Sequence, residues 1–143
     1  MTVKIKKTHP DAVIPRFAHG RGDSGMDLHS VEATTLLPGE RKLVKTGISL
    51  QMPEGLEGQV RPRSGNALKR GLTVLNSPGT IDSSYTGDVG VILVNLGDAL
   101  VTIEKGDKIA QLVFAKVEHP ELVETDSLED TIRGANGFGS TGV

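Results

Sequence analysis

The segment 76–91 carries the residues best suited to chemistry. It contains the acid Asp82 and, three residues later, the only tyrosine of the chain, Tyr85, while Asn76 adds a side-chain amide. A carboxylate can orient and deprotonate a water molecule, and an amide, an aromatic ring and backbone groups together can recognise the edge of a flat heterocycle. Short apolar arms around Gly, Ser and Asp residues predict that this segment is a β-hairpin. An ordinary surface hairpin with an acidic turn has the same pattern.

The stretch 61–71 has the clearest helix signals of the chain. Ser64 is a favourable N-cap, residues 67–70 are good helix formers, and Gly71 suits the position after a helix. The first turn of such a helix presents free N–H groups and the positive end of the dipole, with Arg63 and the Ser64 hydroxyl beside them. These features predict a phosphate site. A capped surface helix with a basic end is the alternative.

Two other polar side chains stand out from their surroundings. Asp27 follows a glycine-rich loop, residues 18–25, and begins a short strand. Gln111 is the amide of an otherwise apolar strand over 108–114. Either could serve a site. A turn-capping carboxylate and a glutamine that points outward from an edge strand are the structural alternatives.

The C-terminal residues 131–143 are predicted to be a mobile, glycine-rich lid. Four of the eleven residues from Arg133 to Val143 are glycine, a composition typical of a flexible terminus. The segment nevertheless carries an arginine that can meet phosphate, an aromatic ring (Phe138) that can stack on a base, and hydroxyls such as Ser140. A lid must be mobile in order to open and close. The acidic stretch before it is predicted to be a solvated connection.

Length and composition predict one domain built mainly from strands. The chain has 143 residues, 36% hydrophobic and only 3% aromatic, so the core must consist of Val, Ile, Leu and Ala. Short apolar segments alternate with Gly- and Pro-containing turns, which favours an all-β sandwich or barrel with one short helix. The four histidines show no metal-ligand spacing and are predicted to lie on the surface.

Charge and cysteine content exclude several classes of protein. Sixteen basic and eighteen acidic residues give a net charge of −2, which does not suit non-specific nucleic-acid binding. The absence of cysteine excludes disulfides, thiolate metal sites and thiol nucleophiles. No apolar run approaches the roughly 18 residues of a membrane span. The basic N-terminus lacks the apolar stretch of a signal peptide.

Five stretches resemble, in order, the five signature motifs of the trimeric dUTPases. They are the glycine-rich loop leading to Met26-Asp27-Leu28, the segment Pro62–Gly65, the segment Gly79–Tyr85, the Gly-x-x-Ile-Ala-Gln-Leu pattern of residues 106–112, and residues 133–142. The chain departs from the family at Ser24, where alanine is common, and at Lys108, where arginine is frequent. The second departure leaves a bidentate ion pair at that position open.

The resemblance implies a small all-β, jelly-roll-like barrel, a single domain over 1–143 that assembles as a homotrimer. Each of its three active sites would draw motifs from all three subunits. The implied activity is Mg²⁺-dependent hydrolysis of dUTP to dUMP and pyrophosphate, which lowers dUTP and supplies dUMP for thymidylate synthesis. The resemblance also implies a cytoplasmic enzyme that binds neither nucleic acid nor membranes.

The resemblance assigns roles that agree with the residue types. Asp82 would be the general base for water attack on the α-phosphorus, and Asp27 would hold Mg²⁺ through water. Asn76 and backbone groups near Thr80 and Gly90 would pair with uracil, and Tyr85 would lie under the deoxyribose. The complete set of substrate-binding residues that we predict is Arg63, Ser64, Gly65, Asn76, Gly79, Thr80, Ile81, Asp82, Tyr85, Gly90, Gln111, Arg133, Phe138, Gly139 and Ser140.

Two other functions share this fold. One is an enzyme like dCTP deaminase, which would place a deaminating acid elsewhere; the complete C-terminal motif argues against it. The other is a regulatory module that binds a protein partner, with hydrolysis secondary. Asp82 and the intact tail favour catalysis without excluding a second role.

Overall fold

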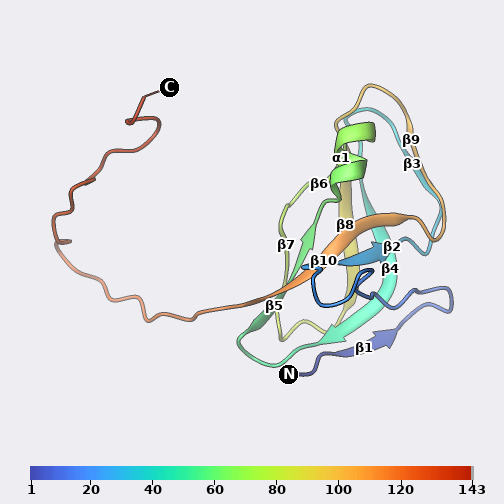
Figure 1. Ribbon diagram of the computed structural model, residues 1–143, viewed down its shortest axis with the longest axis horizontal. Coiled ribbons are helices and arrows are strands. Elements are labelled where there is room, and N and C mark those ends of the chain that lie inside the picture. The colour runs from blue at the N-terminus through green and yellow to red at the C-terminus, as the bar shows by residue number, and fades with distance from the viewer. Residues whose placement is uncertain (143) are drawn as a thin grey trace.

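The computed structural model describes residues 1–142, which form short strands and a single helix (Figure 1). The strands are β1 (Lys4–Lys7), β2 (Met26–His29), β3 (Thr34–Leu36), β4 (Arg41–Gln51), β5 (Leu56–Arg61), β6 (Leu72–Val74), β7 (Gly79–Ile81), β8 (Asp88–Asn95), β9 (Val101–Ile103) and β10 (Lys108–Lys116), and the helix α1 (Ser64–Arg70) lies between β5 and β6. This confirms the prediction of an all-β protein with one short helix.

Two four-stranded antiparallel sheets enclose the core. Their strand orders are β1-β4-β8-β6 and β2-β10-β5-β7, and β3 and β9 form a separate two-stranded ribbon. Most of the fully buried side chains are aliphatic and come from both sheets, for example Leu28 on β2, Val91 on β8 and Leu112 on β10, whereas Ser30, Thr46 and Asn95 are buried polar residues. The shortage of aromatic residues is therefore met by Val, Ile and Leu, as the composition predicted.

The predicted hairpin over 76–91 is wrong. β7 pairs with β5 in one sheet, and β8 pairs with β4 and β6 in the other. Both arms are apolar because Ile81 and Val89 enter the same core from opposite sheets. The chain crosses between the sheets through residues 82–87, which is longer than the two-residue turn that favours direct pairing.

The helix was predicted correctly, but its first cap was not. Arg63, not Ser64, is the N-cap: its backbone is extended (φ −98°, ψ 131°), and its carbonyl accepts the first helical hydrogen bond, from Ala67, at 3.0 Å. Arg63 keeps the extended backbone of β5 while its side chain is tied to β2, and the helix begins at Ser64, one residue earlier than an N-cap at Ser64 would place it. Gly71 ends the helix with a left-handed φ of 63°, as predicted.

The C-terminal segment leaves the barrel after β10. Val117 still donates a hydrogen bond to Gly55, at 3.0 Å, whereas the hydrogen bonds of residues 118–142 are all local to that segment. Figure 1 shows it extending away from the sheets, and Ile132 and Phe138 are fully exposed. No helix within residues 1–142 is long and apolar enough to cross a membrane.

Candidate active site

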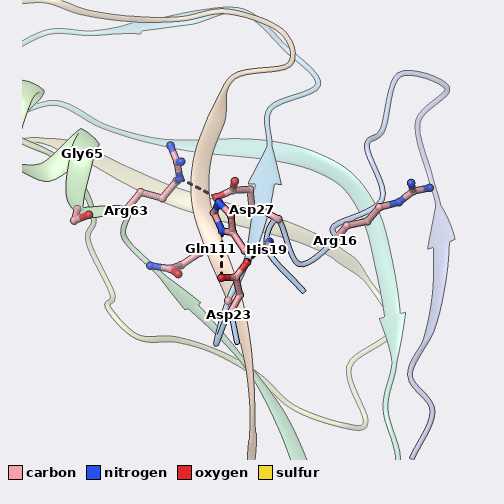
Figure 2. A pocket seen from close by; sticks show the side chains of 10 residues that line it. Arg16, His19, Asp23, Asp27, Arg63, Gly65 and Gln111 are labelled. Atoms are coloured by element: carbon pink, nitrogen blue, oxygen red, sulfur yellow. Dashed lines mark hydrogen bonds and ion pairs between the residues drawn. The ribbon is translucent and has the colours of Figure 1, made fainter. Parts of the chain in front are cut away.

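The order of the second sheet brings three sequence-distant segments together. β10 lies between β2 and β5, so that Gln111 stands opposite Asp27 on one side and Arg61 on the other. The chain then leaves β5 and enters α1 beside them. The resulting hollow of about 240 Å³, which we call the Asp27 hollow, is lined by Arg16, Ala18, His19, Asp23, Gly25, Asp27, Arg63, Ser64, Gly65 and Gln111 (Figure 2).

Two cations share the carboxylate of Asp27. Arg63 donates from Nε to Oδ1 at 2.8 Å, and Lys108 Nζ lies 2.9 Å from Oδ2. Burial raises the pKa of Asp27, but the hydrogen bonds and positive charges of Lys108 and Arg63 outweigh it, so that the pKa lies below its ordinary value. Asp27 is therefore ionised at neutral pH. Each cation contacts a single oxygen of Asp27. The ion pair of Lys108, which the sequence left open, is therefore not bidentate.

Gln111 positions the chain before Arg63. Its Nε2 donates to the carbonyl of Pro62 at 2.9 Å. Its Oε1 lies close to Gly25, where an added Cβ would be 2.4 Å away, so a larger residue at position 25 would displace the Gln111 amide. The family resemblance predicted Gln111 as a substrate-binding residue. The structure shows that it also fixes the start of the helix segment.

The loop before β2 adds residues that the sequence analysis missed. Asp23 accepts a hydrogen bond from the backbone N of His19 at 2.7 Å and lies 3.3 Å from its ring Nδ1. The backbone hydrogen bond from His19 is the main reason why the pKa of Asp23 is lowered. Arg16 lines the same hollow, although Figure 2 shows its guanidinium turned away from Asp27. The sequence signal that could have identified this pair is an aspartate four residues after a histidine within the glycine-rich loop.

The prediction that all four histidines lie on the surface is wrong for His29. His29 is partly buried on β2, and within the described chain its Nδ1 is buried without a hydrogen-bond partner. Burial is the main reason why its pKa is lowered, so the ring is neutral at neutral pH. His9 is also partly covered, and its Nδ1 accepts a hydrogen bond from the backbone N of Asp11 at 3.1 Å.

A second hollow, of about 300 Å³, surrounds Asp82. This Asp82 hollow is lined by Leu43, Asn76, Thr80, Ile81, Asp82, Tyr85, Asp88, Val89, Gly90 and Ile92. The structure thus brings together six predicted residues, although they do not lie on a hairpin. Gly79 lies just outside, where an added Cβ would be 3.5 Å from Asn76 Nδ2.

Backbone contacts shape the Asp82 hollow. The hydroxyl of Tyr85 donates to the carbonyl of Asp88 at 2.9 Å, and the backbone N of Tyr85 donates to the carbonyl of Asp82 at 3.0 Å. Leu43, which the sequence analysis missed, covers Gly90: a Cβ at Gly90 would lie 2.6 Å from Leu43 Cδ1. Leu43 is 61% exposed, so it offers an apolar wall to the hollow.

The two hollows lie at opposite ends of β5. Asp82 directly follows β7, and the pairing of Ile81 with Gly58 places Asp82 beside the start of β5. Arg63 follows the other end of β5. At about 3.3 Å per residue, the extended chain from Glu57 to Arg63 spans about 20 Å. One chain therefore does not place Asp82 and Arg63 on the same phosphate group.

The predicted tail residues join neither hollow. Arg133 donates from Nε to the carbonyl of Asn136, at 2.9 Å, and Phe138 is fully exposed with a φ of 52°. Gly139 and Ser140 belong to the same extended segment. The predicted site residues of one chain thus occupy three separate places.

The sequence is similar to one protein family over almost its whole length. The sequence model of the dUTPase family matches residues 13–142. The deoxyuridine 5'-triphosphate nucleotidohydrolase of Heliobacterium modesticaldum is 54% identical over 160 residues, covering 100% of this chain and 98% of that protein. The protein of the same name from Clostridium novyi is 54% identical over 143 residues, covering 100% of both.

Solved structures share the fold. The dUTPase of Staphylococcus bacteriophage 80alpha with dUPNHPP is 31% identical, covers 99% of both chains and has a TM-score of 0.92. A mutant dUTPase from phage phi11 of S. aureus, whose structure describes the coordination of a structural Mg(II) ion, is 28% identical and has a TM-score of 0.83. That alignment covers 91% of this chain and 100% of the phage chain.

Proposed function

The chain belongs to the dUTPase family and hydrolyses dUTP, and we propose that it does so by water attack on the α-phosphorus, with Asp82 as the general base. The observation that carries this proposal is the Asp82 hollow, which gathers a carboxylate, an amide (Asn76) and an aromatic ring (Tyr85). No covalent nucleophile is needed, because positioning and electrostatic stabilisation supply most of the catalysis in phosphoryl transfer.

In the proposed reaction, Asp82 orients a water molecule and accepts its proton. The water oxygen forms a bond to the α-phosphorus while the bond to the bridging oxygen of the β-phosphate breaks. Pyrophosphate leaves, and dUMP remains. A positioned general base contributes about 10²–10⁴-fold to such a rate.

The Asp27 hollow is suited to the phosphates. Asp27 engages only Nε of Arg63, which leaves the terminal guanidinium nitrogens for phosphate oxygens. Ser64 and Gly65 are the first residues of α1, and their N–H groups have no helical acceptor. Gln111 fixes this segment against β10.

The residues present fit Mg²⁺ only as an ion that arrives with the nucleotide. Residues 1–142 contain no group of three or more His, Cys, Asp or Glu side chains that could hold a metal. Both oxygens of Asp27 already contact cations, so Asp27 would act on the ion through a water molecule. The ion would neutralise charge on the triphosphate. The structural Mg(II) ion of the phi11 enzyme belongs to that protein.

Homotrimeric assembly with shared active sites would reunite the three places. The Asp82 hollow and the Asp27 hollow are separated by about 20 Å along β5, and the tail extends away from both (Figure 1). A site that combines one hollow from each of two chains with the tail of a third would hold the whole nucleotide. In such a site residues 131–142 act as a lid: Arg133 meets phosphate and Phe138, with Gly139 and Ser140, covers the base.

Recognition of the base and sugar would take place in the Asp82 hollow. Asn76 and the backbone near Thr80 and Gly90 would pair with uracil, and the amino group of cytosine would then face a donor. Burying such an unpaired donor is costly. Tyr85 would lie under the deoxyribose, and because its hydroxyl is fixed by Asp88, the ring leaves no space for a 2′-hydroxyl.

The test is incubation of the purified protein with Mg²⁺ and, separately, dUTP, dCTP, dTTP or UTP, followed by measurement of pyrophosphate. We expect selectivity for dUTP over dCTP of about 10⁴-fold, since a hydrogen-bonding site rejects a mispaired analogue to that extent, and a smaller selectivity over dTTP and UTP, whose base edge is that of dUTP. An Asp82→Asn preparation controls for contaminating phosphatases. Comparable turnover of all four nucleotides would contradict the recognition proposal, and release of ammonia from dCTP would support the deaminase alternative.

A further inference from the structure

Lys108, the first residue of β10, takes no direct part in the proposed hydrolysis of dUTP. Its ammonium holds Oδ2 of Asp27 at 2.9 Å while Nε of Arg63 holds Oδ1 at 2.8 Å. Lys108 does not line the Asp27 hollow. It lines the neighbouring hollow, together with Lys7, His29 and Asp27 itself.

A free arginine–carboxylate pair favours a different geometry. Guanidinium and carboxylate groups commonly form two parallel N–H···O bonds, which would direct both donors of Arg63 to Asp27. The observed contact is a single bond from the inner nitrogen Nε. Figure 2 shows the terminal nitrogens of Arg63 turned away from Asp27. The ammonium of Lys108, a compact point charge, occupies the oxygen that the second bond would use.

The backbone fixes Lys108 at this place. It pairs with His29 in the register between β10 and β2, two residues beyond Asp27. Its carbonyl accepts a hydrogen bond from Asn66 Nδ2 at 3.0 Å, which joins the first turn of α1 to the start of β10. The backbone therefore fixes Lys108 relative to Asp27 and Arg63, the two residues with which it forms a charge cluster.

We propose that Lys108 is a positioning residue for dUTP hydrolysis: by holding one oxygen of Asp27, it limits Arg63 to a single contact and leaves the terminal guanidinium nitrogens for the triphosphate. The inference rests on the proposed role of Arg63 in phosphate binding. It differs from direct binding by Lys108, because Lys108 lines the neighbouring hollow and not the Asp27 hollow.

The test is a double-mutant cycle on binding of the non-hydrolysable analogue dUpNHpp. Lys108→Met should weaken binding about tenfold or more, or about 1.4 kcal/mol, because Arg63 can then turn its fork onto Asp27. In an Asp27→Asn background the neutral side chain no longer captures Arg63, so adding Lys108→Met should change binding less than about twofold. Equal losses in both backgrounds would show that Lys108 attracts the phosphates directly and would overturn the proposal.

Two further measurements keep the test independent of activity. Lys108→Arg retains a cation on Asp27 and should bind within about threefold of wild type. NMR of the Arg63 side chain should show slower rotation of its terminal nitrogens in Lys108→Met than in wild type, as a two-bond contact requires. Unchanged rotation in a folded variant would overturn the proposal. If the wild-type protein fails to hydrolyse dUTP, the proposed function fails, whatever Arg63 does.

Discussion

The Asp27 hollow and the Asp82 hollow are built in opposite ways. Side chains tie the first one together: Asp27 is held by two cations, and Gln111 is bonded to Pro62. The second is shaped by backbone contacts and by apolar walls such as Leu43, and Asp82 itself is exposed. Cations that receive a triphosphate must be fixed in advance, because reorganising them would cost binding energy. A base can instead be selected by the shape and the hydrogen bonds of a neutral surface.

This difference predicts how substitutions in the two hollows act. Changes in the Asp27 hollow should affect every nucleoside triphosphate alike, whereas changes in the Asp82 hollow should alter chemistry or selectivity. The tail, which touches neither hollow within one chain, should affect the rate of hydrolysis far more than the binding of dUTP.

Asp82→Asn should have the largest effect. The amide keeps the size of the side chain but cannot accept the proton of the attacking water, so hydrolysis of dUTP should fall by about 10²–10⁴-fold. Binding of dUpNHpp should stay within about threefold, measured by titration calorimetry. Asp88→Asn is the matched control: Asp88 lines the same hollow and accepts a hydrogen bond from Ser49 Oγ at 3.2 Å. An equal loss in both variants would refute the assignment of Asp82 as the base.

Truncation of the chain after Thr131 should have the second-largest effect on hydrolysis. Arg133 would be lost when charge develops in the transition state, an effect of about 10³-fold for an arginine finger. Thermal stability should change little, because Ile132 and Phe138 are fully exposed and bury no apolar area in the chain. If kcat/KM instead stays within about threefold of wild type, the tail is passive.

Mixing the truncated chain with Asp82→Asn chains sharpens this test. If sites are shared, some mixed assemblies combine an intact base from one chain with an intact tail from another, and activity should rise above that of either variant alone. Failure to recover activity after verified subunit exchange would mean that base and lid come from the same chain.

Tyr85→Ala should have a smaller and more selective effect. Loss of the ring opens space for a 2′-hydroxyl, so the ratio of kcat/KM for dUTP over UTP should fall by about 10–100-fold, more than the affinity for dUTP itself. Tyr85→Phe is the control, since it removes the hydrogen bond to Asp88 but keeps the ring. An unchanged ratio in Tyr85→Ala would remove this residue from sugar recognition.

The sequence predicted the family and the fold correctly for physical reasons. Short aliphatic strands and the helix signals around Gly71 are local properties, and all were confirmed. The hairpin prediction failed because pairing is not local: Ile81 and Val89 are equally apolar whether their strands pair or face each other across a core. The prediction of Ser64 as the N-cap failed because the side chain of Arg63 is bound to Asp27, a residue 36 positions earlier in the chain.

The candidate site shows the same limit. Residues of four motifs lie in the two hollows and those of the fifth lie in neither, and the roles of all these residues remain predictions. The charge cluster of Asp27, Arg63 and Lys108 depends on the register of β10 with β2, which the periodicity of the strands does not specify. Leu43 was missed because an apolar residue on a long strand carries no sign that it will stand over Gly90.

The smallest predicted effect is on stability, and it tests whether the Asp27 hollow is held by charge. Ion pairing lowers the pKa of Asp27 in the folded protein, so its contribution to stability is present at neutral pH and is lost as the pH falls through the lowered pKa. Asp27→Asn lacks that contribution at every pH.

At pH 7 Asp27→Asn should therefore be less stable than wild type by about 1 kcal/mol or less, given that the pair is partly exposed. The difference should shrink as the pH falls below about 4, because the protonated carboxyl then resembles the amide. Urea unfolding at fixed protein concentration measures it, with Asp11→Asn as the control for a more exposed pair, Asp11 with Lys105 at 2.9 Å. A stability difference that does not depend on pH would mean that Asp27 stabilises the hollow by packing. The proposed contrast, in which charge holds the Asp27 hollow and shape defines the Asp82 hollow, would then be wrong.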